Sequence, residues 1–421
     1  MYTYQIKDYT ITLNNQGLMR YTKVSYPVRF GIYSELLTRD YIYQFNPNGD
    51  LKYIQAKDKN WPRDEWLKRT DGNDWIYYTP GLYVGLFSYI GEYYLPCFSY
   101  KSNSIFPYNP FEKGIVKMAI NSINSLYSEI YELLNIDLPE SIKNFLSIII
   151  KNNSKTLDFK AKTFHNIIDG KITVLPPDSR HVDYEVIPVI IADGCIYDCD
   201  FCMIKDNKNF KTRKQNNITQ QIQGLKEFYG KNLSNYNSLF LGKNDALYAG
   251  EELIKNTIEE SYNAFDFKKS SIFGTNLFLF ASIESFLDCD DSLFKYLNKS
   301  PYYTYINIGF ESADIETLNF LGKPITVKEV NNAFSKMQEI NRYYDRIEIT
   351  ANFVFSDNLP ENHIPSIIEL NKKLNTSFYE KGGIYLSPLD TTESTIVLKK
   401  KFIKIKNILQ IPVFLYLIQR L

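Results

Sequence analysis

Residues 192–204 read ADGCIYDCDFCMI and hold three of the five cysteines in this 421-residue chain. Cys195, Cys199 and Cys202 follow a C-x3-C-x2-C spacing. An apolar run at residues 186–191 leads directly into the motif, as a buried strand would. Three thiolates on one short loop indicate a soft-metal site, because cysteine thiolates select zinc, copper(I) or iron–sulfur clusters.

The spacing resembles the cysteine loop of the radical SAM superfamily. In that family C-x3-C-x-aromatic-C follows the first strand of a partial barrel and holds a [4Fe–4S] cluster, and Phe201 stands here at the aromatic position. The resemblance implies that Cys195, Cys199 and Cys202 ligate the cluster, with Phe201 beside the cofactor. It also implies that the iron without a protein ligand binds the amino and carboxylate groups of S-adenosylmethionine (SAM). The implied activity is reductive cleavage of SAM, which starts radical chemistry on a substrate that the residues do not identify.

Two other interpretations of the motif stay open at this point. A structural zinc site in a non-enzymatic interaction module needs four closed ligands. His181 would supply the fourth, although no second C-x2-C or H-x3-H pair follows. A redox pair of Cys199 and Cys202 would leave Cys195 without a role. Cys97 and Cys289 stand apart from the motif, and we expect neither to bind the metal.

The composition indicates a globular protein with two domains, or one barrel with an extension. Lysine plus arginine equals aspartate plus glutamate, 48 of each, so no global basic field indicates a nucleic-acid or membrane partner. A local basic groove would still be compatible with this balance. No signal peptide is visible, and no apolar run reaches the ~18 residues of a membrane span. We therefore expect a cytoplasmic protein, where an exposed cluster finds reducing conditions.

Residues 1–178 are predicted to form an α+β domain. Up to about residue 110, short alternating runs such as 9–13 and 41–45 are separated by Asn/Gly turns, which is typical of hairpin strands. Apolar residues at helical spacing then predict helices over 117–134 and 141–150. This region resembles no family that we recognise. By elimination, it is assigned a substrate or accessory role.

Residues 179–390 alternate strands with helices, which indicates a parallel sheet with crossover connections. The predicted α/β fold is a six-stranded partial barrel, (β/α)6, as in the radical SAM family, followed by a helical extension at 391–421. The predicted strands are 186–191, 238–241, 272–280, 304–308, 347–355 and 384–386. The predicted helices are 219–229, 251–265, 283–298, 313–321, 327–341 and 364–374.

The second predicted strand ends in Gly242-Lys243-Asn244-Asp245. In the family a Gly-Gly-Glu-like segment at this place contacts the amino group of SAM. Here Lys243 replaces the second glycine, and Asn244 and Asp245 stand where the acid is expected. The resemblance implies cofactor contacts for Gly242, Asn244 and Asp245. A helix N-cap by Asn244 or Asp245 is an equally good interpretation.

The fourth predicted strand ends in Gly309-Phe310-Glu311-Ser312, and Leu318 and Lys323 follow. This segment resembles one branch of the superfamily, that of the elongator-type, coproporphyrinogen dehydrogenase and methylthiotransferase enzymes. The resemblance implies that Glu311 and Ser312 reach the ribose and the methionine end of SAM. The alternative is a surface salt bridge for Glu311 and a helix N-cap for Ser312.

The fifth and sixth predicted strands supply the remaining candidates. Asn352 is a polar residue on an otherwise apolar strand and needs a partner, for which the cofactor is one candidate. Tyr385 and Leu386 follow the Gly382-Gly383 pair, and in the family this strand lies against the adenine.

The remaining titratable residues carry no separate function in this interpretation. Lys205 and Arg213 follow the cysteine loop; they are interpreted as solvated side chains, with neutralisation of the cluster or binding of a carboxylate as the alternative. The three histidines are too scattered for a catalytic set: His165, His181 and His363. The resemblance also implies a reductant protein of the flavodoxin or ferredoxin type as electron donor. A tRNA-modifying role remains an alternative by analogy with the branch, although no RNA-binding signature accompanies it.

Overall fold

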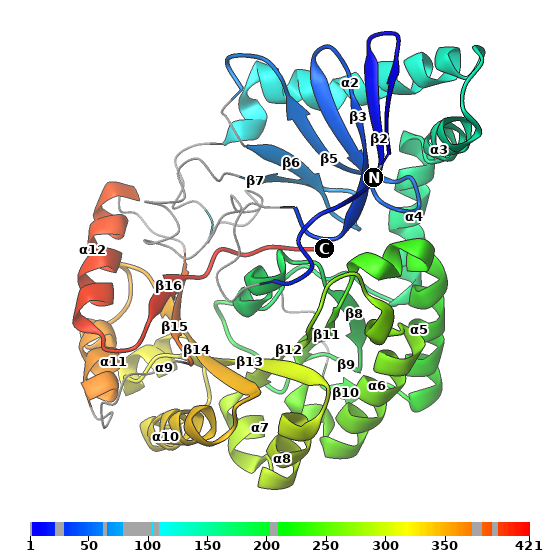
Figure 1. Cartoon of the computed structure of the whole chain (residues 1–421). Helices are drawn as coiled ribbons and strands as arrows, with labels where there is room; N and C mark the ends of the chain where they lie inside the picture. Colours follow the sequence, from blue (N-terminus) through cyan, green and yellow to red (C-terminus); the bar gives the residue numbers. More distant parts are fainter. Residues whose placement is uncertain are drawn as a thin grey trace.

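The computed structural model describes residues 2–21, 29–61, 65–78, 103, 109–202, 209–372, 381–389 and 395–421. An antiparallel sheet formed by the N-terminal residues lies beside an arc of parallel strands that carries helices on its outer side (Figure 1). The predicted α/β fold with an α+β region in front of it is therefore confirmed. None of the described helices has the length and apolarity needed to cross a membrane.

The N-terminal sheet is a seven-stranded antiparallel meander in sequence order. Helices α2 (Gly114–Leu133) and α3 (Glu140–Lys151) cover it, and they match the two helices predicted for this region. Phe45 and Ile54 of the sheet are buried in one hydrophobic cluster with Leu126 and Leu146 of these helices. The strands are β1 (Tyr2–Ile6), β2 (Tyr9–Gln16), β3 (Ile32–Leu37), β4 (Tyr41–Phe45), β5 (Leu51–Ala56), β6 (Trp66–Arg69) and β7 (Trp75–Tyr78).

The parallel sheet has seven strands in the order β16-β15-β14-β13-β12-β11-β8. Six of them match the predicted strands: β8 (Ile187–Ile190), β11 (Ser238–Asp245), β12 (Thr275–Ser282), β13 (Tyr302–Glu311), β14 (Ile347–Phe355) and β15 (Ile384–Pro388). The seventh, β16 (Val413–Leu415), pairs with β15 and follows α12 (Thr395–Ile408). The extension predicted as helical therefore also adds an edge strand, which is too short to leave a periodic signal in the sequence.

Helices follow the strands and cover the outer face of the arc (Figure 1). The predicted helix over 283–298 is two helices that are separated at Cys289 and Asp290, because both residues have extended backbone. The helices are α5 (Gln215–Tyr229), α6 (Glu251–Ala264), α7 (Ile283–Asp288), α8 (Asp291–Lys299), α9 (Ile315–Phe320), α10 (Val327–Tyr343) and α11 (His363–Lys372).

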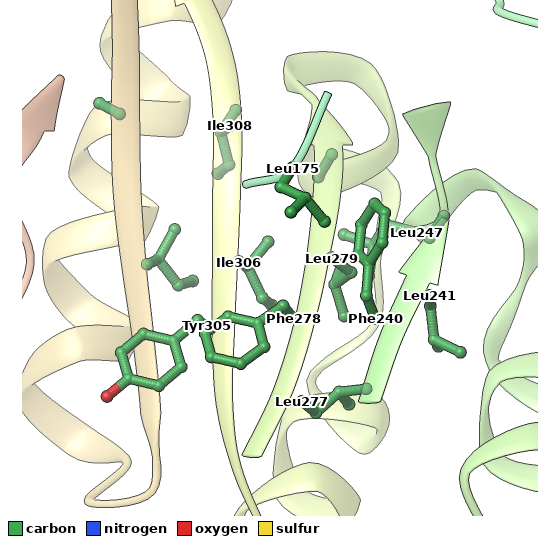
Figure 2. Packing of buried hydrophobic residues seen from close by; sticks show 14 of the residues in the cluster. Leu175, Phe240, Leu241, Leu247, Leu277, Phe278, Leu279, Tyr305, Ile306 and Ile308 are labelled. Atoms are coloured by element: carbon green, nitrogen blue, oxygen red, sulfur yellow. The ribbon is translucent and has the colours of Figure 1, made fainter. Parts of the chain in front are cut away.

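The inner face of the arc is filled by large side chains from neighbouring strands. Phe278 and Tyr305 stack with ring centroids 5.0 Å apart and planes inclined by 8°. Figure 2 shows these two rings side by side, with Ile306 further along the same strand and Leu175 lying across the strands. The segment before the first barrel strand therefore packs inside the arc rather than on its surface.

A short 3-10 helix, η3 (Pro177–Val182), is buried inside the arc. The carboxylate of Asp178 accepts hydrogen bonds from the hydroxyls of Thr350, at 2.7 Å, and Tyr385, at 2.9 Å. Burial raises the pKa of Asp178 to about 6. His181 packs against Tyr305, with centroids 5.4 Å apart. This segment fills the arc toward the N-terminal ends of its strands.

Charged groups join the N-terminal sheet to the barrel. Lys52 of β5 and Lys68 of β6 both contact the carboxylate of Glu185, at 3.1 and 2.5 Å, and all three side chains are buried. The barrel core also begins before residue 178, since Phe164 of α4 (Ser154–Ile167) belongs to it. The division into 1–178, 179–390 and 391–421 stays a prediction.

Candidate active site

A cavity of about 470 Å³ opens at the C-terminal ends of the parallel strands. This is the end at which barrel enzymes carry their chemistry, because the loops that follow the strands meet there. Eight of the residues predicted for the site line it: Cys195, Cys199, Phe201, Cys202, Asn244, Asp245, Glu311 and Asn352. The structure therefore brings together side chains from the cysteine loop and from three different strands.

The cysteine loop leaves the sheet after β8 and is held at several points. The short strands β9 (Ala192–Asp193) and β10 (Lys211–Thr212) pair at its base, and Cys195 forms a bridge to Asn209. At its far side the amide of Asp200 donates to the carbonyl of Leu321 at 3.1 Å. Cys195 and Cys202 are partly exposed and Cys199 is buried. Lys205 and Cys97 lie outside the described residues.

Lys323 is a cavity residue that the sequence analysis did not assign. Its ammonium group is buried, lies 4.8 Å from the ring centroid of Tyr197, and donates to the carbonyl of Gly309 at 3.1 Å. Burial raises the pKa of the thiols of Cys195 and of Cys199, the latter to about 11, and the charge of Lys323 opposes the shift in both. The signal in the sequence was the place of Lys323 as the basic residue that ends the segment starting at Gly309.

Glu311 and Asn352 offer hydrogen-bond acceptors to the cavity. Glu311 Oε1 lies 3.3 Å from the Nζ of Lys323, whereas its Oε2 is buried without a hydrogen-bond partner. Burial raises the pKa of this carboxyl, although Lys323 opposes the shift. Asn352 Oδ1 is likewise buried without a partner. The hydroxyl of Tyr197 and the Oδ2 of Asp245, on the same cavity, also lack a hydrogen-bond partner. Buried polar atoms are normally satisfied, so four such atoms on one cavity indicate a place for ligand groups.

The end of β11 lines the cavity and also makes hydrogen bonds within the fold. Asn244 Nδ2 donates to the carbonyl of Gly194 at 2.8 Å, next to the first cysteine. Asp245 Oδ1 accepts from the hydroxyl of Ser285 at 2.8 Å and from the amide of Tyr248 at 3.2 Å. Gly242 does not line the cavity, and a Cβ there would lie 2.9 Å from the ring of Phe240. The glycine therefore permits this close packing.

Three further residues predicted to contact SAM lie away from the cavity. Ser312 is fully buried, and its hydroxyl lies 2.9 Å from Nδ1 of His363. The Tyr385 hydroxyl is bound to Asp178, and Leu386 is buried in the barrel core. Ser387 lines the cavity instead. It shares a face of β15 with Tyr385, because alternate residues of a strand point the same way, and it lies two residues closer to the C-terminal end of the strand.

One wall of the cavity is apolar and comes from segments outside the strand ends. Tyr416 and Ile418 follow β16, and Val174 precedes η3. The hydroxyl of Tyr416 donates to the carbonyl of Leu175 at 2.7 Å, and the amide of Ile418 donates to the side chain of Asn103 at 2.9 Å. Figure 1 shows this last segment running back from β16 between the sheet and the barrel.

The profile of the radical SAM superfamily matches residues 189–370. This chain contains a radical SAM domain. The matched residues include all three cysteines of the loop and every strand from the end of β8 to β14. The domain is an enzyme domain, and enzymes of this superfamily use a [4Fe–4S] cluster and SAM. The predicted superfamily, enzyme class and cofactors are thereby confirmed, whereas the branch within the superfamily stays a prediction.

The solved structures that match this chain are distant in sequence. A radical SAM methyltransferase from Sphaerobacter thermophilus shares 13% identity at a TM-score of 0.39, over 55% of this chain and 65% of its own. The cobalamin-dependent S-adenosylmethionine radical enzyme OxsB shares 14% identity at a TM-score of 0.34, over 55% of this chain and 31% of its own. Methylornithine synthase (PylB) shares 13% identity at a TM-score of 0.32, over 67% of this chain and 77% of its own. This chain therefore spans less than two thirds of the length of the first two. No curated protein matches the sequence.

The site fits both cofactors of the radical SAM domain. Three cysteines on one cavity provide the thiolates of a [4Fe–4S] cluster. The unpartnered oxygens of Glu311 and Asn352 provide acceptors for hydroxyl and amino groups. His181 does not line the cavity. Among the described residues, no three His, Cys, Asp or Glu side chains converge on the position of a single metal ion, and the three cysteines share the cavity without converging in this way.

Proposed function

We propose that this protein is a radical SAM enzyme whose cluster is held by Cys195, Cys199 and Cys202, and that it starts radical chemistry on a substrate bound in the same cavity. The observation that carries the proposal is the meeting of these cysteines with the unpartnered oxygens of Glu311 and Asn352 on one cavity. When bound, the two cofactors supply one-electron cleavage of the sulfonium to methionine and a 5′-deoxyadenosyl radical, which removes a hydrogen atom from the substrate.

The protein's own residues bind and orient the cofactors. Glu311 Oε2 and Asn352 Oδ1 are placed to accept hydrogen bonds from hydroxyl or ammonium groups. Lys323 brings a positive charge to the same part of the cavity, where it offsets the charge of Glu311 and favours the thiolate form of the cysteines. The predicted roles of Gly242, Ser312, Tyr385 and Leu386 have less support, because these four residues do not line the cavity.

We assign the substrate to the half of the cavity that lies against the apolar wall of Val174, Tyr416 and Ile418. The five charged residues that line the cavity come from the cysteine loop and from the strand ends and their turns: Asp198, Lys243, Asp245, Glu311 and Lys323. A charged substrate group against the wall would lose its hydration without gaining a partner. We therefore expect the part of the substrate that faces the wall to be uncharged. The wall also excludes water from the radical.

Radical SAM enzymes generally require an electron donor, and we propose a reductant protein of the flavodoxin or ferredoxin type in a reducing cytoplasm. A tRNA-modifying role rests only on analogy with the predicted branch. No observation on the described residues favours it separately, and the substrate stays unidentified.

The test of the proposed function is reconstitution with iron and sulfide under anaerobic conditions. We expect a brown protein with iron and sulfide in the ratio of a [4Fe–4S] cluster. After addition of dithionite and SAM it should release methionine and 5′-deoxyadenosine in equal amounts. A colourless protein that binds zinc with high affinity and cleaves no SAM would contradict the proposal.

Replacing Glu311 by glutamine is expected to weaken SAM binding by about 1–3 kcal/mol, the range for hydrogen bonds to charged groups. The amide oxygen would keep the contact with Lys323, while an NH2 group would replace the unpartnered Oε2. Calorimetric titration of SAM into the reconstituted variant measures the loss.

Ser312→Ala is the matched comparison for Glu311→Gln. Because the Ser312 hydroxyl bonds to His363 and faces no cavity, this variant should lower the melting temperature and leave SAM affinity unchanged. If Ser312→Ala weakened SAM binding and Glu311→Gln did not, the assignment of Glu311 would be wrong.

A further inference from the structure

Arg213 joins the base of the cysteine loop to the end of helix α4. Its guanidinium donates twice to the carboxylate of Asp193, from Nε to Oδ2 and from Nη2 to Oδ1, both at 2.7 Å. It also donates from Nη1 to the carbonyl of Ile168 at 2.7 Å and from Nη2 to that of Asp169 at 3.0 Å. The side chain is only 7% exposed. The interpretation of Arg213 as a solvated side chain is therefore wrong, and the alternative, that it binds a carboxylate, agrees with the pair to Asp193.

Each of these contacts satisfies a group that the fold leaves in need of a partner. The last carbonyls of a helix have no intrahelical donor, and a cation is favourable at that end of the helix dipole. A bidentate ion pair between arginine and a carboxylate fixes the relative orientation of the two groups as well as their distance, which a single hydrogen bond does not do. Asp193 thereby gains a fixed position relative to α4, although its own carboxylate is 29% exposed.

Asp193 stands two residues before the first cysteine. It pairs with Lys211 across the β9–β10 ladder, and the backbone amide of Arg213 donates to the carbonyl of Ile191 at 2.8 Å. Between Asp193 and Cys195, the carbonyl of Gly194 is bound by Asn244. The entry and the exit of the loop are thus tied to each other, to the sheet and to α4.

We propose that Arg213 and Asp193 are positioning residues for the cluster site: their ion pair fixes the base of the cysteine loop so that three thiols face the cavity before any cluster is present. This inference rests on the proposed role of the cysteines as cluster ligands. It extends that role to a pair that touches neither cavity nor thiol. Because the chain enters Cys195 directly from Asp193 and Gly194, movement at the base changes the direction in which the first thiol points.

The test compares Arg213→Met, which removes all four hydrogen bonds and keeps the apolar stem, with Asp193→Asn, which keeps the bonds to α4 and removes the ion pair. Arg346→Met is the matched control. Arg346 also donates to two carbonyls, those of Tyr302 at 3.2 Å and Pro301 at 2.7 Å, but before strands β13 and β14 and away from the loop. Iodoacetamide alkylation of each cysteine in the cluster-free protein is followed by mass spectrometry.

We expect Cys195 to be alkylated about tenfold faster in Arg213→Met than in the unaltered protein, as loss of charged hydrogen bonds opens the loop locally. Asp193→Asn should give a smaller increase. Cys289, outside the loop, should react at an unchanged rate in all proteins, and Arg346→Met should leave Cys195 unchanged. After reconstitution, Arg213→Met should also lose iron faster to a ferrous chelator.

Two results would overturn the inference: unchanged alkylation of Cys195 in both loop variants, or equal acceleration of Cys195 and Cys289 together with a large fall in melting temperature. The second result would mean that the pair stabilises the fold as a whole and not the loop. Alkylation requires no cluster, so it tests the pair even if the unaltered protein fails to bind iron. That failure would count against the proposed function alone.

Discussion

Cys199→Ala protein is expected to come out of anaerobic reconstitution without a [4Fe–4S] cluster and to form no 5′-deoxyadenosine. The reason is that a four-iron cluster held by three thiolates has no spare protein ligand, so loss of one thiolate leaves two irons without protein bonds. The measurements are iron and sulfide content, the absorbance of the cluster, and release of 5′-deoxyadenosine. Cys195→Ala and Cys202→Ala should behave in the same way.

Cys289→Ala is the control for these cysteine variants. Its sulfur lies at the end of α7, makes a long contact of 3.7 Å with the carbonyl of Asp290, and faces no part of the cavity. We expect this variant to assemble the cluster and cleave SAM as the unaltered protein does. If Cys199→Ala held an intact cluster and cleaved SAM normally, the assignment of the three cysteines as cluster ligands would be wrong.

Glu185→Gln is expected to lower the free energy of unfolding by about 3–5 kcal/mol, the usual cost of breaking a buried ion pair. The substitution would remove the carboxylate that the buried ammonium groups of Lys52 and Lys68 share, and Lys52 would keep its longer contact of 3.8 Å with Asp71. Denaturant unfolding measures the loss. Glu35→Gln is the control, because the pair of Glu35 with Arg29 is partly exposed and should contribute less than about 1 kcal/mol.

The same pair predicts a pH dependence. Burial alone raises the pKa of Glu185, but Lys52 and Lys68 outweigh it and hold the pKa at about 2 against an ordinary value of 4.5. A lowered pKa means that the stabilisation is complete above pH 4.5 and is lost as the pH falls toward 2. The loss amounts to about 3 kcal/mol at about 1.4 kcal/mol per pKa unit. The assignment would be contradicted if the free energy of unfolding of Glu185→Gln fell between pH 5 and pH 2 by as much as that of the unaltered protein.

The sequence was sufficient for the elements whose signals are local. Strands β11 to β15 and the helices between them have clear periodicity, and the cysteine loop is recognisable from thirteen consecutive residues. The split between α7 and α8 was missed because Asp290, the N-cap position of α8, lies inside a continuous helical pattern. Strand β16 was missed because it has only three residues, and it is recognisable as a strand only from its pairing with β15.

The sequence identified which strands carry site residues, but it did not say which residues of those strands face the cavity. Glu311 and Asn352 were found, since a polar residue at the end of an apolar strand stands out. Leu386 was chosen where Ser387 faces the cavity, because the sequence does not say which face of a buried strand points inward. Arg213 was read as solvated because its partners, Asp193 and the end of α4, are brought to it only by the fold.

Tyr416 and Ile418 line the cavity and belong to a part of the chain that is synthesised after every other described element. Their contacts join positions far apart in sequence, since Asn103 and Ile418 are separated by 315 residues. Contacts of this kind form late, because a long loop must close before they are gained. During synthesis the cysteine loop is therefore present for a time before the apolar wall of the cavity has formed. We expect that interval to give an incoming iron–sulfur cluster its widest access to the three thiols.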